Sequence, residues 1–114
     1  MPSKRSFYWH VPYVLDIEKM RQASLHFLGQ HDFSALCNRR KNLNYPNKIR
    51  TIEAISLLTP QENDLLITVK GPQFLYKMVR NIVGTLVYVG MGKISAEEIP
   101  SILQAQSRPA AGIT

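Results

Sequence analysis

The chain has 114 residues, which is enough for one domain with a modest hydrophobic core and too few for two comfortable ones. Apolar residues make up 45% of it and charged residues 19%, a balance typical of a globular protein that excludes a disordered tail. The net charge of +6 favours a polyanionic partner, although many basic proteins bind no nucleic acid.

The first part of the chain predicts a short strand followed by a helix. Residues 1–6 are expected to be a disordered lead-in. The aromatic-rich run Phe7–Val11 is compatible with a short strand. Asp16 stands at an N-cap position, apolar residues follow it at helical spacing, and Gly29 supplies a stop. This pattern predicts a helix over residues 17–28.

The middle of the chain predicts a basic loop and a β-hairpin. Residues 31–37 are ambiguous and are compatible with a turn that leads into a short strand. Asn38–Asn47 has the composition of a loop. Residues 50–58 alternate weakly and are rich in β-branched side chains, and residues 65–70 form a second apolar run. Because residues 60–64 between them favour a turn, the two runs predict an antiparallel hairpin.

The strongest helical pattern covers residues 74–89. At 100° per residue, one side of this helix gathers apolar residues: Leu75, Met78, Ile82, Leu86 and Val89. The opposite side gathers Gln73, Tyr76, Lys77, Arg80 and Gly84. The capping box Ser95–Glu98 predicts a last short helix over residues 96–106. Together the elements predict a single α+β domain, an antiparallel sheet with helices packed on one face.

Arg80 is the residue that says most about function. Residues 65–96 contain no Asp or Glu, so its guanidinium needs solvent or an anion from elsewhere, because burying an unpaired charge costs several kcal/mol. One interpretation is an arginine on the wet face of an amphipathic helix. Against it, Gly84 lies one turn later, and a mid-helix glycine costs about 1 kcal/mol relative to alanine. With Tyr76 and Lys77 beside it, Arg80 is expected to bind a carboxylate or a phosphate.

The loop after residue 38 is the second candidate for function. It has no acidic residue, and Tyr45 lies among its cations. The cations, which are the candidate RNA contacts together with Lys77, are Arg39, Arg40, Lys41, Lys48 and Arg50. One interpretation is a cationic arm that tracks a phosphate backbone, with a ring available for stacking. The other is a solvated loop whose charge only aids solubility.

The residues that would make a complete active site are mostly missing. His10, His26 and His31 have neither HExxH nor paired-cysteine spacing, which argues against a zinc site. Cys37, the single cysteine, excludes an internal disulfide framework and indicates the reducing cytoplasm as the compartment. It has no evident activating partner, which favours a buried thiol. By these residues alone, the chain predicts a binding surface.

The string GPQFLYKMVRNIVGTLVYVGMGK, from Gly71 to Lys93, resembles the late motif of the tRNA pseudouridine synthase A family. Leu28–Ser34 is similar to a further family stretch that contains His-Asp-Phe, and Arg50–Ile52 resembles the start of the family's next strand. The segment Arg108–Thr114 is similar to a late family segment that contains Ala-Gly. The resemblance covers nearly the whole chain.

The resemblance implies an isomerase that converts uridine into pseudouridine in the anticodon stem-loop of tRNA, with no cofactor and no metal. In the family an aspartate attacks the flipped nucleotide, the glycosidic bond breaks, the base rotates and a C–C bond forms. Arg80 corresponds to the arginine that pairs with this aspartate and keeps it ionised. Phe74, Met78, Tyr76 and Gly84 are the candidate pocket residues, although helical phasing places Met78 on the core side.

The chain departs from the family pattern in its catalytic half. The Arg-Thr-Asp-Ala-Gly-Val-His type motif that carries the nucleophile does not occur, and neither does the Arg-Tyr-x-Tyr type motif or the family's Gly-Leu-x-Leu strand. We therefore expect the chain to correspond to the middle and C-terminal portion of a longer homodimeric enzyme, with tRNA and its own N-terminal half as partners. We expect it to be inactive alone. The alternatives are a stand-alone RNA-binding module without chemistry, and a purely structural fragment.

Overall fold

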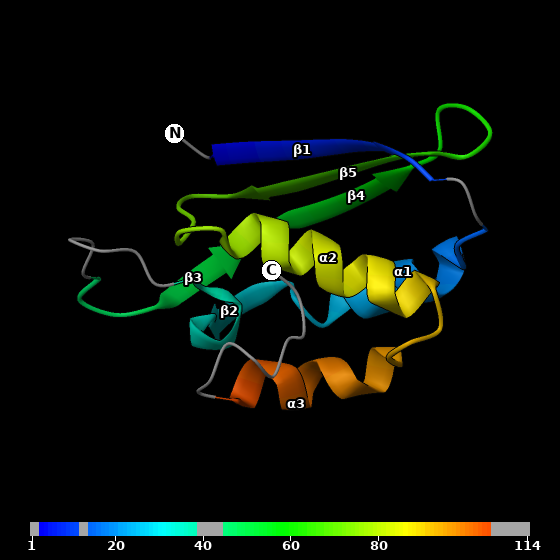
Figure 1. The fold of residues 1–114 in the computed structure, drawn as a ribbon. Coiled ribbons are helices and arrows are strands. Elements are labelled where there is room, and N and C mark those ends of the chain that lie inside the picture. The colour runs from blue at the N-terminus through cyan, green and yellow to red at the C-terminus, as the bar shows by residue number, and fades with distance from the viewer. Residues whose placement is uncertain (1–2, 12–13, 39–44, 106–114) are drawn as a thin grey trace.

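The computed structural model describes residues 3–11, 14–38 and 45–105. In these residues, three strands form one antiparallel sheet in the order β1-β5-β4, and β2 pairs with β3 in a second antiparallel sheet (Figure 1). The strands are β1 (Ser3–His10), β2 (Gly29–Asp32), β3 (Ile49–Ile52), β4 (Ala54–Leu58) and β5 (Asp64–Gly71). The helices are α1 (Ile17–Leu25), α2 (Met78–Gly90) and α3 (Ile99–Gln104), with short 3-10 turns at Ser34–Leu36 and Ala96–Glu98. The predicted α+β class is confirmed.

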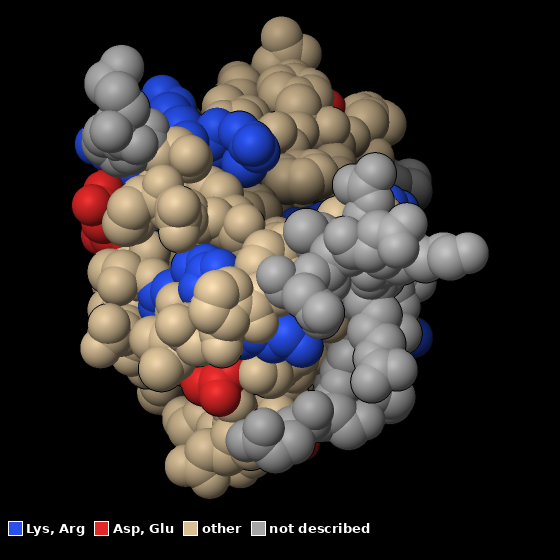
Figure 2. All heavy atoms as spheres, turned by 90° about the vertical axis from the view of Figure 1, so that its left-hand side faces the viewer, with Lys and Arg blue, Asp and Glu red and all other residues tan. Residues whose placement is uncertain are grey.

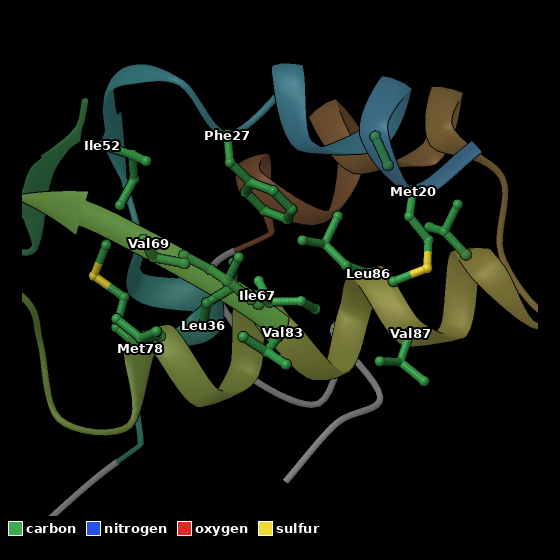
Figure 3. Packing of buried hydrophobic residues seen from close by; sticks show 14 of the residues in the cluster. Met20, Phe27, Leu36, Ile52, Ile67, Val69, Met78, Val83, Leu86 and Val87 are labelled. Atoms are coloured by element: carbon green, nitrogen blue, oxygen red, sulfur yellow. The ribbon is translucent and has the colours of Figure 1, made fainter. Parts of the chain in front are cut away.

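Helix α2 occupies the middle of the molecule. In Figure 1 the three-stranded sheet lies on one side of it and α3 on the other. Every residue of α2 is buried except Arg80, which is exposed, and Tyr88, which is half-buried. Figure 3 shows Val83 and Leu86 of this helix in the same apolar cluster as Ile67 of β5 and Phe27, which follows α1. A helix that is enclosed on nearly all sides holds its few exposed residues in defined places.

The N-terminal elements begin and end at other residues than the sequence predicts. Ser3–Ser6, expected as part of a disordered lead-in, belong to β1 and pair with β5, while the first two residues lie outside the described ones. The N-cap at Asp16 is confirmed, since its carboxylate accepts a hydrogen bond from the backbone N–H of Lys19 at 3.1 Å. Helix α1 ends at Leu25, and Gly29, with a φ of +88°, already opens β2.

The predicted hairpin is confirmed for β4 and β5, which pair antiparallel from Ala54–Lys70 to Leu58–Leu66. The single strand predicted over residues 50–58 is wrong, because the chain divides at Glu53 into β3 and β4, which belong to different sheets. The Glu53 backbone N–H still donates to Lys70 O at 2.7 Å, so the division does not leave it unpaired.

The predicted helix over residues 74–89 begins only at Met78. Lys77 stands before it in the left-handed conformation, with φ at 59°, and Asn81 N donates to Lys77 O at 3.0 Å in the first turn. A left-handed conformation costs a residue with a side chain about 1–2 kcal/mol, so contacts from elsewhere in the fold must maintain it. The capping box at Ser95 and Glu98 is confirmed, and helical structure follows it as predicted.

Gly71, at the end of β5, is a point of close approach between the two sheets. A Cβ atom at this position would lie 2.4 Å from the carbonyl oxygen of Thr51 in β3 and 3.2 Å from the Phe74 ring. Because the nearer atom belongs to the backbone, relief would require β3 or β5 to move.

We expect Gly71→Ala to lower the free energy of unfolding by about 1–3 kcal/mol, the usual effect of overpacking. Urea denaturation would measure it. Gly90→Ala is the matched comparison, because the atoms that its Cβ would meet first belong to the flexible side chain of Met20. A loss at Gly90 equal to or larger than the loss at Gly71 would contradict this account.

Asp64 joins the ends of β1 and β5 on the outer side of the sheet. The Tyr8 hydroxyl donates to its Oδ2 atom, and His10 Nδ1 lies 2.9 Å from its Oδ1 atom. The hydrogen bond from Tyr8, followed by the one from His10, lowers the pKa of Asp64 below its ordinary value. The same hydrogen bond raises the pKa of Tyr8. The folded state therefore favours the ionised form of Asp64.

The lowered pKa gives the folded chain an acid-sensitive contact. The contribution of Asp64 to stability is complete above its unfolded-state pKa, near 4, and is lost as the pH falls through the lower pKa of the folded state. We expect Asp64→Asn to remove this part of the acid dependence when the urea midpoint is followed between about pH 6 and pH 2. Glu62→Gln, an exposed carboxylate of the same turn, serves as control. Equal acid dependence in the Asp64→Asn variant and the unmutated protein would refute the prediction.

Candidate functional site

Arg80 is an exposed cation in the first turn of a buried helix. Its neighbours Val79 and Asn81 are both buried. The eight Asp and Glu residues of the chain all lie within the described ranges. Among the described side chains, Asp16 and Glu18 form ion pairs with Lys19 and Arg21, Asp64 contacts His10, and Arg80 takes part in none of these contacts. The guanidinium is thus open to an anion from outside this part of the chain.

The charge at the start of α2 is the reverse of what helix stability favours. The N-terminus of a helix carries a partial positive charge, so acidic residues stabilise the first turn and basic residues do not. Helix α2 has no acidic residue in its first turn. Instead, Lys77 and Arg80 are both exposed there. The two cations and the helix dipole together make this end of α2 attractive to an anion.

The turn before α2 is held by residues far away in the sequence. Tyr76 N donates to the Tyr45 hydroxyl at 2.9 Å, and Tyr76 O accepts from Asn38 N at 3.1 Å. The buried side chain of Asn81 donates to Leu36 O at 2.7 Å and to Asn38 Oδ1 at 2.8 Å. These contacts connect both sides of the basic loop to the segment that carries Arg80.

The predicted RNA contacts lie in different environments. Arg39, Arg40 and Lys41 lie outside the described residues. Lys48 is half-buried, and Lys77 is exposed with its Nζ atom 5.5 Å from the centroid of the Tyr76 ring.

Arg50 is the most constrained of the predicted RNA contacts. It is half-buried, and its Nη1 atom donates to Ile49 O at 2.7 Å and to Asn47 O at 3.2 Å. Its guanidinium carbon lies 5.4 Å from the centroid of the Tyr45 ring, a cation–π distance. The Arg50 guanidinium therefore already has hydrogen-bond and ring contacts within the fold.

The four predicted pocket residues divide into two groups. Phe74 and Tyr76 are half-buried in the segment between β5 and α2. Met78 and Gly84 are buried, and Met78 belongs to the hydrophobic core (Figure 3), as helical phasing had indicated. Gly84 does not share the exposure of Arg80, although the helical projection placed them on one side. Neighbouring elements cover this part of α2, which a projection of one helix does not take into account.

Further cations that the sequence did not single out lie at the same end of the molecule. Lys4 of β1 pairs directly opposite Lys70 of β5, and both are exposed. Like charges opposite one another destabilise a strand pair. Figure 2 views this end and shows Lys and Arg atoms at several places across it. The sequence shows these two lysines only as separate residues near the ends of two strands. That they lie opposite one another becomes clear only from the register of β1 and β5.

The remaining candidates for chemistry are unsuitable. Cys37 is buried, and burial raises the pKa of its thiol, which disfavours the reactive thiolate. His31 Nε2 lies 2.8 Å from the Leu28 carbonyl oxygen, and His26 is exposed beyond the end of α1. Within the ranges that the structure describes, no three His, Cys, Asp or Glu side chains are grouped as metal ligands would be. No described helix has the length and apolarity of a membrane span.

Comparison with known proteins decides the family. A protein-family model described as tRNA pseudouridine synthase matches residues 23–114. The chain belongs to the tRNA pseudouridine synthase family. It is 53% identical over its whole length to tRNA pseudouridine synthase A 2 of Protochlamydia amoebophila and covers 44% of that protein. It is 46% identical over 97% of its length to tRNA pseudouridine synthase A of Halalkalibacterium halodurans and covers 41% of it. The chain thus spans less than half the length of these curated relatives.

Membership of the tRNA pseudouridine synthase family gives the exposed arginine a context. Arg80 and the turn that precedes it both lie inside the matched residues.

Asn38 and Asn81, which connect that turn to the basic loop, were not singled out by the sequence. A buried asparagine in an apolar helix was the signal that could have found Asn81, since a buried amide needs partners.

Proposed function

We propose that this chain is the arginine-bearing portion of an enzyme that isomerises uridine to pseudouridine in the anticodon stem-loop of tRNA. The observation that carries the proposal is the exposed Arg80 within the family-matched region, which has no ion pair with any carboxylate side chain of the chain. Its missing anion is the nucleophilic aspartate of an N-terminal half. The whole enzyme is expected to be a cytoplasmic homodimer.

Arg80 acts by holding that aspartate ionised and oriented. A guanidinium forms two parallel hydrogen bonds to a carboxylate, which fixes its direction as well as its charge. The aspartate attacks the flipped nucleotide, and the bond between N1 and the ribose breaks. The base rotates and is joined to the ribose through C5, and the bond to the aspartate breaks, which restores the carboxylate. The C5 hydrogen leaves as a proton, and N1 takes up a proton, so the product is an isomer of the substrate.

The basic surface around α2 supplies the attraction to tRNA. Lys77 is exposed close to Arg80 in the sequence, Lys48 directly precedes β3, and Arg50 lies within β3. Arg39, Arg40 and Lys41 extend this series in the sequence. Phosphate neutralisation by such residues makes affinity fall with salt. Phe74 and Tyr76, half-buried in the segment between β5 and α2, are the candidate rings for contact with the flipped base, and the other two candidate pocket residues, Met78 and Gly84, are buried.

Arg80→Lys in the full-length enzyme tests the proposal. We expect turnover of unmodified tRNA to fall by about a hundredfold or more, because an ammonium cannot hold a carboxylate at two points and small misplacements have effects of this size. The affinity for tRNA should remain nearly unchanged, since the positive charge is retained. Tritium release from C5-labelled uridine would measure turnover. Arg21→Lys, an exposed arginine of α1, is the matched control and should remain active.

The rival function, RNA binding without chemistry, is favoured by the same basic surface. Under that reading the full-length protein binds tRNA in a salt-dependent way and releases no tritium, whatever residue stands at position 80. Release of tritium by the 114-residue chain alone would contradict the part of the proposal that assigns the nucleophile to another segment. If the full-length protein leaves the electrophoretic mobility of tRNA unchanged at low salt, both functions are contradicted.

A further inference from the structure

We propose that Tyr45 is a positioning residue for Arg80. Its hydroxyl holds the turn that starts α2, and through this turn it sets the place of the arginine relative to the nucleophile. The proposal rests on the proposed function, because only a catalytic arginine requires such placement.

The turn before α2 has one internal backbone hydrogen bond, from Met78 N to Leu75 O at 3.0 Å, but it also contains a strained residue. Lys77 is in the left-handed conformation, and no side chain caps the N-terminus of α2. Residues with side chains adopt this conformation only where their surroundings enforce it, and such residues cluster at functional sites. Arg80 follows within the same first turn, so a change at Lys77 changes the direction in which the arginine leaves the helix.

Tyr76 is fixed on both of its backbone polar groups. Its N–H donates to the Tyr45 hydroxyl at 2.9 Å, and its carbonyl accepts from Asn38 N at 3.1 Å. Asn38 is in turn held by the buried Asn81, whose Nδ2 donates to Asn38 Oδ1 at 2.8 Å. Rotation of the Tyr76–Lys77 peptide would break the hydrogen bond between Asn38 N and Tyr76 O, and rotation of the preceding peptide would break the one to the Tyr45 hydroxyl. The two contacts therefore restrain the backbone directly before the left-handed residue.

The Tyr45 ring is in contact with Arg50, one of the predicted RNA contacts. The Arg50 guanidinium lies against it at 5.4 Å, and Arg50 is fastened to Ile49 O and Asn47 O. The Arg50 Nε atom is buried and has no hydrogen-bond partner. Tyr45 thus joins a predicted phosphate-binding segment to the turn that precedes the arginine.

Tyr45→Phe in the full-length enzyme tests the inference, because it removes the hydroxyl and keeps the ring against Arg50. We expect the single-turnover rate of pseudouridine formation to fall about tenfold. The Kd for tRNA and the thermal midpoint should stay close to those of the unmutated enzyme. Hydrogen exchange at the Tyr76 amide should become faster, since its acceptor is gone. Tyr88→Phe, in the distal half of α2, is the matched control and should keep the full rate.

If the unmutated enzyme is active, three outcomes decide against the inference. A Tyr45→Phe rate within about twofold of the unmutated enzyme would show that the contact does not position the arginine. A parallel fall in rate, tRNA affinity and thermal midpoint would indicate a purely structural contact. An equal loss in Tyr88→Phe would show an effect not specific to the turn. If the unmutated enzyme makes no pseudouridine, the proposed function fails and the inference fails with it. If the unmutated enzyme is active and the Tyr45→Phe variant is equally active, only the inference fails.

Discussion

The packing of α2 between the sheet and the other helices is the contact on which the remaining structure depends. Val83 and Leu86 lie in the same cluster as Ile67 and Phe27, so the helix has little freedom to rotate or slide (Figure 3). An enclosed helix holds its side chains rigidly in place, and Arg80 is its one exposed residue. The place of the arginine thus depends on the apolar packing of α2 and on the contacts of the turn before it, and not on polar contacts of the arginine itself.

Helix α2 is well packed along its length, but the charges at its N-terminus are unfavourable for helix stability. Lys77 and Arg80 add positive charge where the helix dipole is already positive, and Lys77 also has a left-handed backbone. Neither feature stabilises the fold. A bound anion of the kind proposed would compensate the charge, and the left-handed turn is already formed before it binds. Local features that weaken the free chain are expected where a protein is built to bind.

Periodicity predicted the apolar side of α2 and the β4–β5 hairpin correctly, because both depend on local alternation of residue types. It could not predict where α2 starts, since nothing in a lysine at position 77 signals a positive φ. It joined β3 to β4, because alternation continues through Glu53. The change of sheet there follows from the pairing of β3 with β2 and of β4 with β5, which local alternation does not reveal. Arg80 could be found from its lack of acidic neighbours, but its attachment through Asn38 and Tyr45 required the fold.

The pairing of Lys4 with Lys70 has a practical consequence for handling the protein. Dissolved ions screen the repulsion between these two exposed ammonium groups, so the β1–β5 edge is firmer in concentrated buffer. Nucleic-acid capture by a cationic surface responds in the opposite sense, because released counterions then gain less entropy. Purification and storage favour high ionic strength, whereas binding and activity measurements require dilute electrolyte, and a single buffer cannot serve both well.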